Sequence, residues 1–490
     1  MISAGSGTTI APDELATGLG HWTGGRGPVY RQLAEALKAA VTAGDLLPGR
    51  RLPAERQLAR ELAVSRSTIL AAFDVLKREG WLHSRQGSGT WLSRPDAATP
   101  PAADQSAARS LRANPFLRPG APVPIDLATA ALPAHPLVGQ VVESLRAGDM
   151  RALLDGHGYT ASGLSELRER VAATFSAASV PTARDEILVT TGTQQGLALA
   201  AALAIRPGDV ALVENPTSPG VLDALRAAGA DIRAVPVGPH GARIDTLEEL
   251  MTRLSPRLVV VVPTFHNPTA AVMPAGARRR LAALAERLQI LVAEDMSHGD
   301  IVLGEDPPPP LAHYADGHVL SLGSMSKLFW GGLRVGWVRA PSHLVARLSR
   351  RKATADLGTP LLSQLVAARL LARRDEVAAA RREQLLPRLD RLAALLAREL
   401  PAWRWTRPAG GLSAWVELPD GNATAFAQVA QRHGVSVVPG PLLSADESHQ
   451  RHLRISFAPG MAAIAEGVNR LAAAWAAHAG APADAPEAVL

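Results

Sequence analysis

Apolar residues near the N-terminus recur with the spacing of buried helix faces. Leu33, Leu37 and Val41 follow one another at four-residue intervals after Pro28, a residue that suits the first turn of a helix. After a Pro-Gly break, a second short helix is predicted over Ala54–Leu62. The pattern therefore predicts two short helices that each bury one face.

A third helix and a hairpin follow these two. Ser65 is a good N-cap, and apolar residues then recur at helical spacing to about Glu79. Beyond that helix, Gly87 and Gly89 stand between two short apolar runs, which predicts a β-hairpin with a glycine-rich tip. Three helices with a tight turn before the third, followed by a hairpin wing, form a layout that reads DNA.

The regular pattern stops over residues 94–124. Seven prolines stand there among alanine, serine and aspartate, and such a segment cannot bury enough apolar surface to fold. We therefore expect an extended linker after a reader of residues 28–93. The Gly/Ser/Thr-rich residues 1–27 and the Ala/Pro-rich residues 479–490 are expected to be disordered.

Residues 125–478 alternate helical patterns with short β-branched runs. This alternation is typical of an α/β domain with a mostly parallel sheet and helices on both faces. Long helices from about Ser342 onward, then strands near Ser413–Glu417 and Leu453–Phe457, predict a smaller C-terminal α+β lobe of about residues 342–478. The strands predicted for the main sheet are Ile187–Thr190, Val210–Glu214, Leu258–Val262, Ile290–Asp295 and Val319–Gly323.

Composition narrows the class of protein. A chain of 490 residues suggests two or three domains, and 47% hydrophobic with 20% charged residues is typical of globular proteins. No apolar run reaches the roughly 20 residues of a membrane helix, and the first residues do not resemble a signal peptide. Because there is no cysteine, disulfides and cysteine-bound metals are excluded, and we expect a cytoplasmic protein without metal or membrane contact.

The distribution of charge is more informative than the net charge of +6. From Arg50 to Arg85, eight lysines and arginines stand against four acidic residues. This excess indicates a phosphate-facing surface on the predicted reader, although a solvated interaction module would look similar.

Three short motifs identify the kind of reader. Leu52–Ala59 (LPAERQLA), Val64–Thr68 (VSRST) and Gly87–Thr90 (GSGT) together resemble the GntR family of winged helix-turn-helix proteins. The resemblance implies that the third helix enters the major groove and the wing touches the minor groove. Arg66 is the best candidate for a bidentate contact with guanine. The DNA-binding residues that the resemblance implies are Arg56, Ser65, Arg66, Ser67, Thr68, Gly87 and Gly89.

The strongest chemical motif is a lysine in the turn after a predicted strand. Ser324-Met325-Ser326-Lys327 follows Val319–Gly323, and a desolvated lysine can form a Schiff base with an aldehyde. Arg334, seven residues later, could clamp a phosphate with two hydrogen bonds. Taken alone, this motif would also fit a surface lysine.

Other polar residues follow neighbouring predicted strands. Asp295 could pair with a protonated pyridine nitrogen, and Asn267 could donate to a phenolic oxygen. Gly192–Gln194 opens a helix whose backbone N–H groups could hold a phosphate. Because ligands gather at the carboxyl ends of strands in open α/β sheets, we expect these residues to meet.

In this order and spacing, the segments resemble fold-type I pyridoxal-phosphate enzymes, the aspartate aminotransferase superfamily. The resemblance implies pyridoxal 5′-phosphate as the cofactor, with Lys327 as its covalent attachment and Asp295 as the partner of its ring nitrogen, the two catalytic residues. It also implies that Arg454 binds the α-carboxylate of an amino acid. The other cofactor-binding residues that it implies are Asn267, Gly192, Thr193, Gln194, Ser324 and Arg334.

The resemblance is weakest at the tyrosines. Where the superfamily carries a tyrosine after the ring-binding aspartate, this chain has Ser297 and His298, and Ser218 stands where an aromatic residue often covers the ring. His298 could replace the missing phenol as a donor to the cofactor. Tyr159 is a candidate for binding the phosphate of a partner subunit. These departures leave cofactor binding expected and efficient transamination in doubt.

A GntR-type reader, a linker and an aminotransferase-like domain together resemble the MocR subfamily of bacterial regulators. The resemblance implies a homodimeric transcription regulator that binds a DNA operator and senses pyridoxal phosphate, or an amine or amino acid condensed with it. Two alternatives stay open. The chain could be an active aminotransferase with an auxiliary reader, or a regulator whose second domain is only a dimerisation scaffold.

Overall fold

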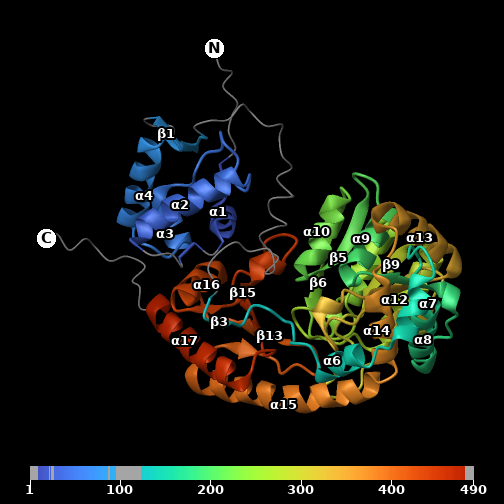
Figure 1. Cartoon of the computed structure of the whole chain (residues 1–490). Helices are drawn as coiled ribbons and strands as arrows, with labels where there is room; N and C mark the ends of the chain where they lie inside the picture. The colour runs from blue at the N-terminus through green and yellow to red at the C-terminus, as the bar shows by residue number, and fades with distance from the viewer. Residues whose placement is uncertain (1–8, 21, 24–26, 86–88, 95–122, 480–490) are drawn as a thin grey trace.

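The computed structural model describes residues 9–20, 22–23, 27–85, 89–94 and 123–479 (Figure 1). These residues form an N-terminal reader, a large α/β lobe and a smaller C-terminal lobe. Nearly all of the expected linker and C-terminal tail lies outside the described residues. Among the described helices, none is both long enough and apolar enough to cross a membrane.

The reader has the three helices and the hairpin that the sequence predicts. Ser65 caps the third helix, because its Oγ accepts the backbone N–H of Thr68 over 3.1 Å. The apolar residues predicted to face inward are buried in one core, and the wing strands pair in antiparallel fashion. The elements of the reader are α1 (Pro12–Leu19), α2 (Val29–Thr42), α3 (Glu55–Glu61), α4 (Arg66–Arg78), β1 (Leu82–Arg85) and β2 (Gly89–Leu92).

The expectation of disorder over residues 1–27 is wrong where α1 forms. Leu15 and Leu19 are buried in the core of the reader, and α1 contacts α2 and α3. The carboxylate of Glu14 pairs with Arg50 over 2.6 Å. Two leucines at four-residue spacing are a weak signal for a helix. The glycine, serine and threonine residues around them favoured a prediction of disorder.

The large lobe is built on one sheet with the strand order β4-β11-β10-β9-β8-β5-β6-β7. The central strands β10, β9, β8, β5 and β6 run parallel, whereas β11 is antiparallel to both of its neighbours. The carboxyl ends of the parallel strands therefore lie at one edge. The strands are β4 (Ile187–Thr190), β5 (Val210–Asn215), β6 (Asp231–Gly238), β7 (Gly241–Ala242), β8 (Leu258–Val261), β9 (Leu291–Asp295), β10 (Val319–Ser324) and β11 (Gly336–Arg339).

Helices cover both faces of this sheet, as predicted. Two clusters of buried apolar residues, drawn from strands and helices, pack them together. The mostly parallel α/β fold is confirmed. The helices of the large lobe are α6 (Pro136–Glu143), α7 (Ala147–Leu154), α8 (Ser165–Ala177), α9 (Thr193–Ala204), α10 (Pro219–Ala227), α11 (Ile244–Leu254), α12 (Ala275–Leu288), α13 (Ser342–Asp356) and α14 (Leu361–Leu371), with short 3-10 turns at η2 (Arg184–Glu186), η3 (Leu311–His313) and η4 (Gly331–Leu333).

The small lobe begins later than predicted. Leu344 and Leu348 of α13 are buried against the main sheet, and α14 packs on α6 and α8, so these helices belong to the large lobe. The long helix α15 joins the two lobes (Figure 1). The small lobe contains α15 (Arg374–Glu399), β12 (Arg404–Trp405), β13 (Ser413–Glu417), α16 (Ala423–Arg432), β14 (Val435–Ser436), β15 (Val438–Pro439), η5 (Gly440–Leu443), β16 (His452–Ser456) and α17 (Met461–Ala479), and β3 (Ile125–Asp126) pairs with β14.

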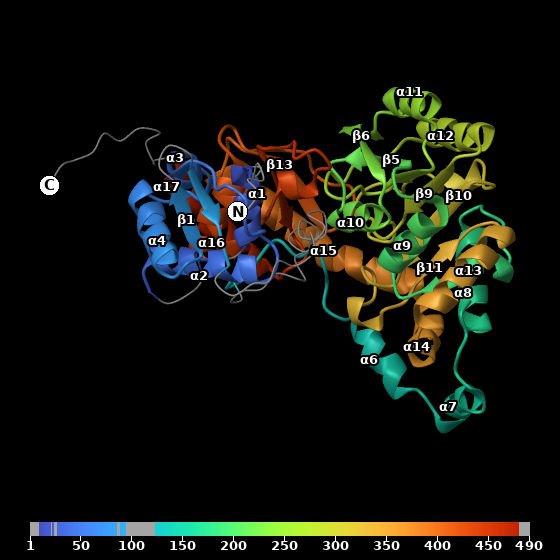
Figure 2. The ribbon, with the colours of Figure 1, turned by 90° about the horizontal axis from the view of Figure 1, so that it is seen from above.

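The reader lies on the small lobe and away from the main sheet. Both views place α1 to α4 beside α16 and well apart from β9 (Figures 1 and 2). Helix α16 contacts both α1 and α3. The reader therefore contacts the small lobe at a distance from the sheet that carries the lysine motif.

Candidate functional site

Lys327 lies in the turn after β10, at the carboxyl edge of the parallel strands. Its Nζ donates to the backbone carbonyl oxygen of Ala130 over 2.7 Å. Loss of water around the ammonium, and then the positive charge of Arg454, lower the pKa of Lys327 to about 8, although Asp295 opposes this. Such an amine is neutral far more often at pH 7 than an exposed lysine.

Asp295 ends β9, the strand next to β10. The two strands are in register so that Leu322 is opposite Asp295. The Oδ1 of Asp295 accepts the backbone N–H of Ser297 over 2.8 Å, and burial raises the pKa of the carboxyl. The structure thus places a partly buried carboxyl near the partly buried amine, as the sequence predicts.

The start of α9 forms a cradle for an anion. Gly192 precedes the helix with a φ of 115°, a conformation that favours glycine. The Nη2 of Arg334 donates to the carbonyl oxygen of Thr191 over 2.5 Å, which holds the guanidinium at the helix N-terminus. The buried Oγ1 of Thr193 has no hydrogen-bond partner among the described residues. These groups fit a phosphate, which would accept from all of them.

Arg454 on β16 enters the same site from the small lobe. Its side chain is buried, and its Nη1 donates to Oδ1 of Asn267 over 3.1 Å. Its Nη2 donates to the carbonyl oxygen of Ala128 over 2.7 Å. Arg454 therefore joins the small lobe to the loop of the large lobe that carries Asn267, and the Oδ1 bond leaves the Asn267 amide to serve as a donor.

A cavity of about 690 Å³ brings most of the predicted residues together. Tyr159 is the exception, because its side chain is 65% exposed and does not line the cavity of its own chain. The amide of Gln194 does line it, but donates to the carbonyl oxygen of Gly220 over 2.8 Å and so ties α9 to α10. The predicted residues that line the cavity are Gly192, Thr193, Gln194, Asn267, Asp295, His298, Ser324, Lys327, Arg334 and Arg454.

The positions that lack tyrosine are in this cavity too. His298 is buried, and its pKa lies well below the ordinary value because of burial and the positive charges of Lys327 and Arg454. The imidazole is therefore neutral. Ser218 lines the cavity where an aromatic ring would cover the cofactor. The site thus keeps its ionic contacts and loses its aromatic cover.

A buried acid–base pair lies under the loop that carries Asn267. Oε2 of Glu214 is 3.4 Å from Nε2 of His266 and accepts the backbone N–H of Val262 over 2.6 Å. Burial raises the pKa of Glu214 to about 8 and lowers the pKa of His266 to about 3. Both side chains are therefore uncharged at pH 7.

Sequence reasoning missed the loop of residues 128–132 and Trp330. The loop acts through the backbone carbonyls of Ala128 and Ala130, which every residue type possesses, so the sequence carried no signal for it. Trp330 lines the mouth of the cavity and is 41% exposed. The sequence shows a tryptophan three residues after the lysine, and this residue could have been included among the candidate site residues.

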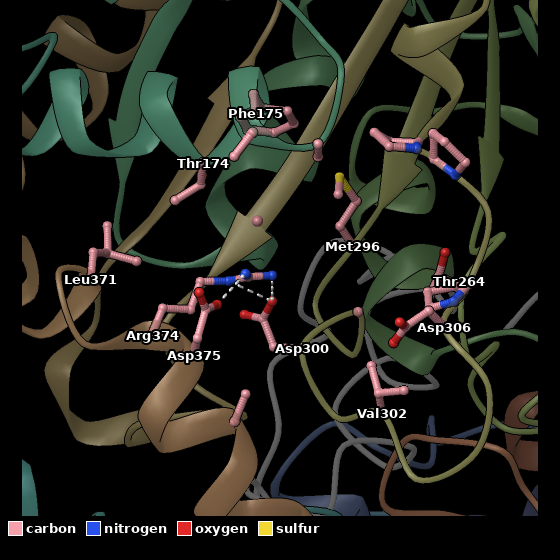
Figure 3. A pocket seen from close by; sticks show the side chains of 18 of the residues that line it. Thr174, Phe175, Thr264, Met296, Asp300, Val302, Asp306, Leu371, Arg374 and Asp375 are labelled. Carbon is pink, nitrogen blue, oxygen red and sulfur yellow. Dashed lines mark hydrogen bonds and ion pairs between the residues drawn. The ribbon is translucent and has the colours of Figure 1, made fainter.

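A second cavity, also of about 690 Å³, lies beside the start of α15 (Figure 3). Arg374 there pairs with Asp300 over 2.5 Å and with Asp375 over 3.2 Å. Arg382, the other arginine of its lining, donates to the carbonyl oxygen of Gly304 over 3.1 Å. Both arginines of this lining therefore already have partners.

The reader presents the start of α4 to solvent. Ser65, Arg66 and Ser67 are exposed there, and Arg56 is exposed on α3. Nη2 of Arg66 pairs with Oε2 of Glu55 over 3.1 Å. The predicted residues Thr68 and Gly89 are described, with a φ of 121° at the glycine, whereas Gly87 lies outside the described residues. The predicted contacts with bases and phosphates remain predictions.

The reader and the small lobe meet at the turn of the helix-turn-helix. Arg432, at the end of α16, donates from Nη1 to the carbonyl oxygen of Leu62 over 3.2 Å and from Nη2 to that of Ala63 over 2.8 Å. Ala63 has a φ of 49°, the left-handed conformation in which the chain reverses between α3 and α4. Burial lowers the pKa of Arg432. Arg432 thus binds the turn that sets the orientation of α4.

Known protein families match both the reader and the two lobes that follow it. Residues 131–471 match the aminotransferase class I and II family, and residues 29–92 match the gntR family of bacterial regulatory proteins. An uncharacterized HTH-type transcriptional regulator, YisV of Bacillus subtilis, is 30% identical over 91% of this chain and 96% of its own length. The probable rhizopine catabolism regulatory protein MocR of Rhizobium meliloti is 30% identical over 66% of this chain and 67% of its own length.

The large and small lobes also resemble a solved enzyme. LysN, an α-aminoadipate aminotransferase from Thermus thermophilus solved with N-(5′-phosphopyridoxyl)-L-leucine, is 31% identical with a TM-score of 0.65 over 72% of this chain and 92% of its own. The family match and this neighbour indicate pyridoxal phosphate as the cofactor, and the anion cradle, Lys327 and Asp295 line a cavity that fits such a group. The chain belongs to the aminotransferase class I and II family and is a MocR-type regulator, in which that domain is fused to a gntR-family reader.

Proposed function

We propose that this regulator senses an amino acid at Lys327 and passes the result to DNA through the small lobe. The observation that carries the proposal is the double role of that lobe. It supplies Arg454 to the lysine cavity, and it holds the turn of the reader through Arg432. A ligand that moves the lobe at one end therefore has a physical connection to α4 at the other.

When bound, the cofactor would supply an aldehyde carbon able to bind the amine of Lys327 or that of an incoming amino acid. Lys327, once free of that carbon, would take up the proton that the incoming ammonium loses. Lys327 accepts that proton readily only if Ala130 or another acceptor holds the new ammonium, and the carbonyl of Ala130 already stands 2.7 Å away.

Arg454 would then exchange partners. In the structure it binds Asn267 and the carbonyl oxygen of Ala128. A carboxylate offers two charged acceptors to the same fork and so competes for it. Because a ligand shifts an equilibrium only by its differential affinity for the two states, this exchange is the step that can favour a different placement of the small lobe.

A shift of the small lobe would reach DNA through its contact with the reader. A shift of α16 changes the position of Arg432 and hence the turn at Ala63, and two readers in a homodimer must keep a fixed spacing to fit two half-sites. A coupling free energy of about 1–3 kcal/mol would change operator affinity by about 5- to 150-fold. The linker is a second route that lies outside the described residues.

The alternative of an active aminotransferase has less support. Transamination requires repeated proton transfers at the cofactor, and the cavity has Ser218, Ser297 and a neutral His298 at the positions where this superfamily places aromatic and phenolic groups. The full-length relatives with a reader are regulators by name.

The test measures cofactor and DNA in one sample. The holoprotein is titrated with amino acids while the absorbance of the bound cofactor and the affinity for operator DNA are both recorded. We expect one class of amino acid to change the two together, and Arg454→Ala to lose both changes while the absorbance still reports cofactor on Lys327. Many turnovers of amino acid to oxo acid, with no effect on DNA affinity, would support the enzyme instead.

A further inference from the structure

The geometry around Lys327 and Arg454 restricts how an amino acid can lie in the cavity. Nζ of Lys327 and Nη2 of Arg454 donate to two carbonyl oxygens of one short loop, those of Ala130 and Ala128, each over 2.7 Å. The two carbonyl groups that Lys327 and Arg454 bind are therefore two residues apart along the same loop. An α-amino acid, whose amine and carboxylate share one carbon, would have that carbon beside this loop.

A longer spacing between the amine and the acid fits less well. In a 4-amino acid, two more carbons separate the two groups, and the chain would have to fold back to reach both Lys327 and Arg454. Arg454 is close enough to Lys327 to lower the pKa of its ammonium, which agrees with a short spacing. The geometry favours α-amino acids.

The charged groups of the cavity are all committed. Among the described lining residues, Asp295 serves the ring nitrogen, Lys327 the aldehyde, Arg334 the phosphate and Arg454 the carboxylate. His298, the remaining ionisable residue of that lining, is buried among cations and is neutral. A second carboxylate or a second ammonium on the ligand would therefore be buried without a partner of opposite charge, which is costly.

Two large apolar side chains belong to the same lining. Leu132 follows the two carbonyls along the same loop and is 5% exposed. Trp330 borders the mouth, and its indole lies so close to the backbone of Gly332 that a Cβ there would be 2.3 Å from Cζ2. The absence of a side chain at Gly332 thus leaves room for the indole, an apolar group in the same lining as Lys327.

We infer that the sensed ligand is an α-amino acid with an uncharged, apolar side chain that packs against Leu132 and Trp330. This inference rests on the proposed function and names the ligand class of that same site. Apolar surface of the side chain is removed from water there, and the carboxylate of the amino acid takes over from the carbonyl oxygen of Ala128 as the acceptor for Arg454.

The first test compares ligands on the full-length holoprotein. L-leucine and L-phenylalanine are titrated against L-glutamate, L-lysine and 4-aminobutanoate, with cofactor absorbance as the readout. We expect apparent Kd values at least about tenfold lower for the apolar pair. Equal or tighter binding of a charged amino acid or of 4-aminobutanoate would overturn the inference and leave the proposed function standing. Silence with every amine would overturn both.

Variants locate the side chain. Trp330→Ala should raise the Kd of L-leucine about tenfold while changing that of L-alanine less than about twofold, and Trp330→Phe should retain most of the affinity. Leu132→Asn should act in the same selective way. Leu362→Asn is the matched control, because Leu362 is 50% exposed on α14 and does not line the cavity. An equal loss for L-leucine and L-alanine would contradict the assignment of this wall.

Discussion

Nη2 of Arg432 donates to the carbonyl oxygen of Ala63 over 2.8 Å. The small lobe thus binds the reader at the turn that orients the recognition helix α4. Removing the guanidinium leaves two turn carbonyls without this donor. We expect Arg432→Ala to retain cofactor absorbance and amino acid binding, and to reduce the change in operator affinity that the amino acid causes.

The matched control for this variant is Arg404→Ala. Arg404 lies in the same lobe, is 70% exposed and pairs only with Glu417 among the partners that the structure describes. It should leave the response intact. If Arg432→Ala responded as fully as the unaltered protein, the contact at Ala63 would not be the route of the signal.

A second prediction concerns DNA specificity. Arg66→Ala should weaken operator binding by about 1–3 kcal/mol and relax the preference at one base pair, because a bidentate guanine contact would be lost. Glu55→Gln should have the opposite effect on overall affinity, since the carboxylate that now holds Arg66 over 3.1 Å would no longer repel phosphates. Binding isotherms on operator and scrambled duplexes distinguish the two effects, with Arg253→Ala on the distant helix α11 as a control.

A third prediction follows from the pKa of about 8 for Lys327. Condensation with an aldehyde requires the neutral amine, which is about one-tenth of the population at pH 7 for that pKa. The rate at which cofactor-free protein takes up pyridoxal phosphate should therefore rise about tenfold per pH unit below pH 8 and level off above it. Stopped-flow absorbance measures it. A rate that kept rising to pH 10 would indicate an ordinary lysine.

A fourth prediction concerns stability and the buried pair of Glu214 and His266. The folded pKa of Glu214 is raised to about 8, so its stabilising effect is complete at low pH and is lost as pH rises toward 8. The folded pKa of His266 is lowered to about 3, so its effect is present above the ordinary pKa and is lost as pH falls toward 3. The two effects offset each other in between.

The free energy of unfolding should consequently fall by about 2 kcal/mol from pH 6.5 to 8 through Glu214. Glu214→Gln keeps an acceptor for the backbone N–H of Val262 and removes the titration, so it should flatten this decline. Urea unfolding at several pH values tests the difference between the two proteins. Parallel curves would show that Glu214 is ionised in the folded state.

Residues that act through their side-chain type could be predicted from the sequence. Lys327, Asp295 and Asn267 each follow a β-branched run, and the carboxyl ends of parallel strands meet at one edge, so their convergence followed from the strand pattern. Ser65 could be predicted as a cap from its residue type, because few side chains can accept a backbone N–H from that position.

Contacts made through backbone carbonyls could not be predicted. Arg432 binds Leu62 and Ala63, and Lys327 binds Ala130, but any residue offers a carbonyl oxygen and only the folded chain brings it near. The start of the small lobe was misplaced for a related reason, because the periodicity of α13 shows that one face is buried without showing which surface buries it.

Helix α1 has a practical consequence for dissecting this regulator. A fragment starting at Val29 would retain the DNA-contacting helices and the wing but would lose the cover over its core, exposing the apolar surface that Leu15 and Leu19 bury. Such a fragment would tend to self-associate in solution, and a weak shift on a gel would then reflect aggregation and not operator affinity. Reader fragments for crystallisation or for selecting operator sequences should begin before Ile10.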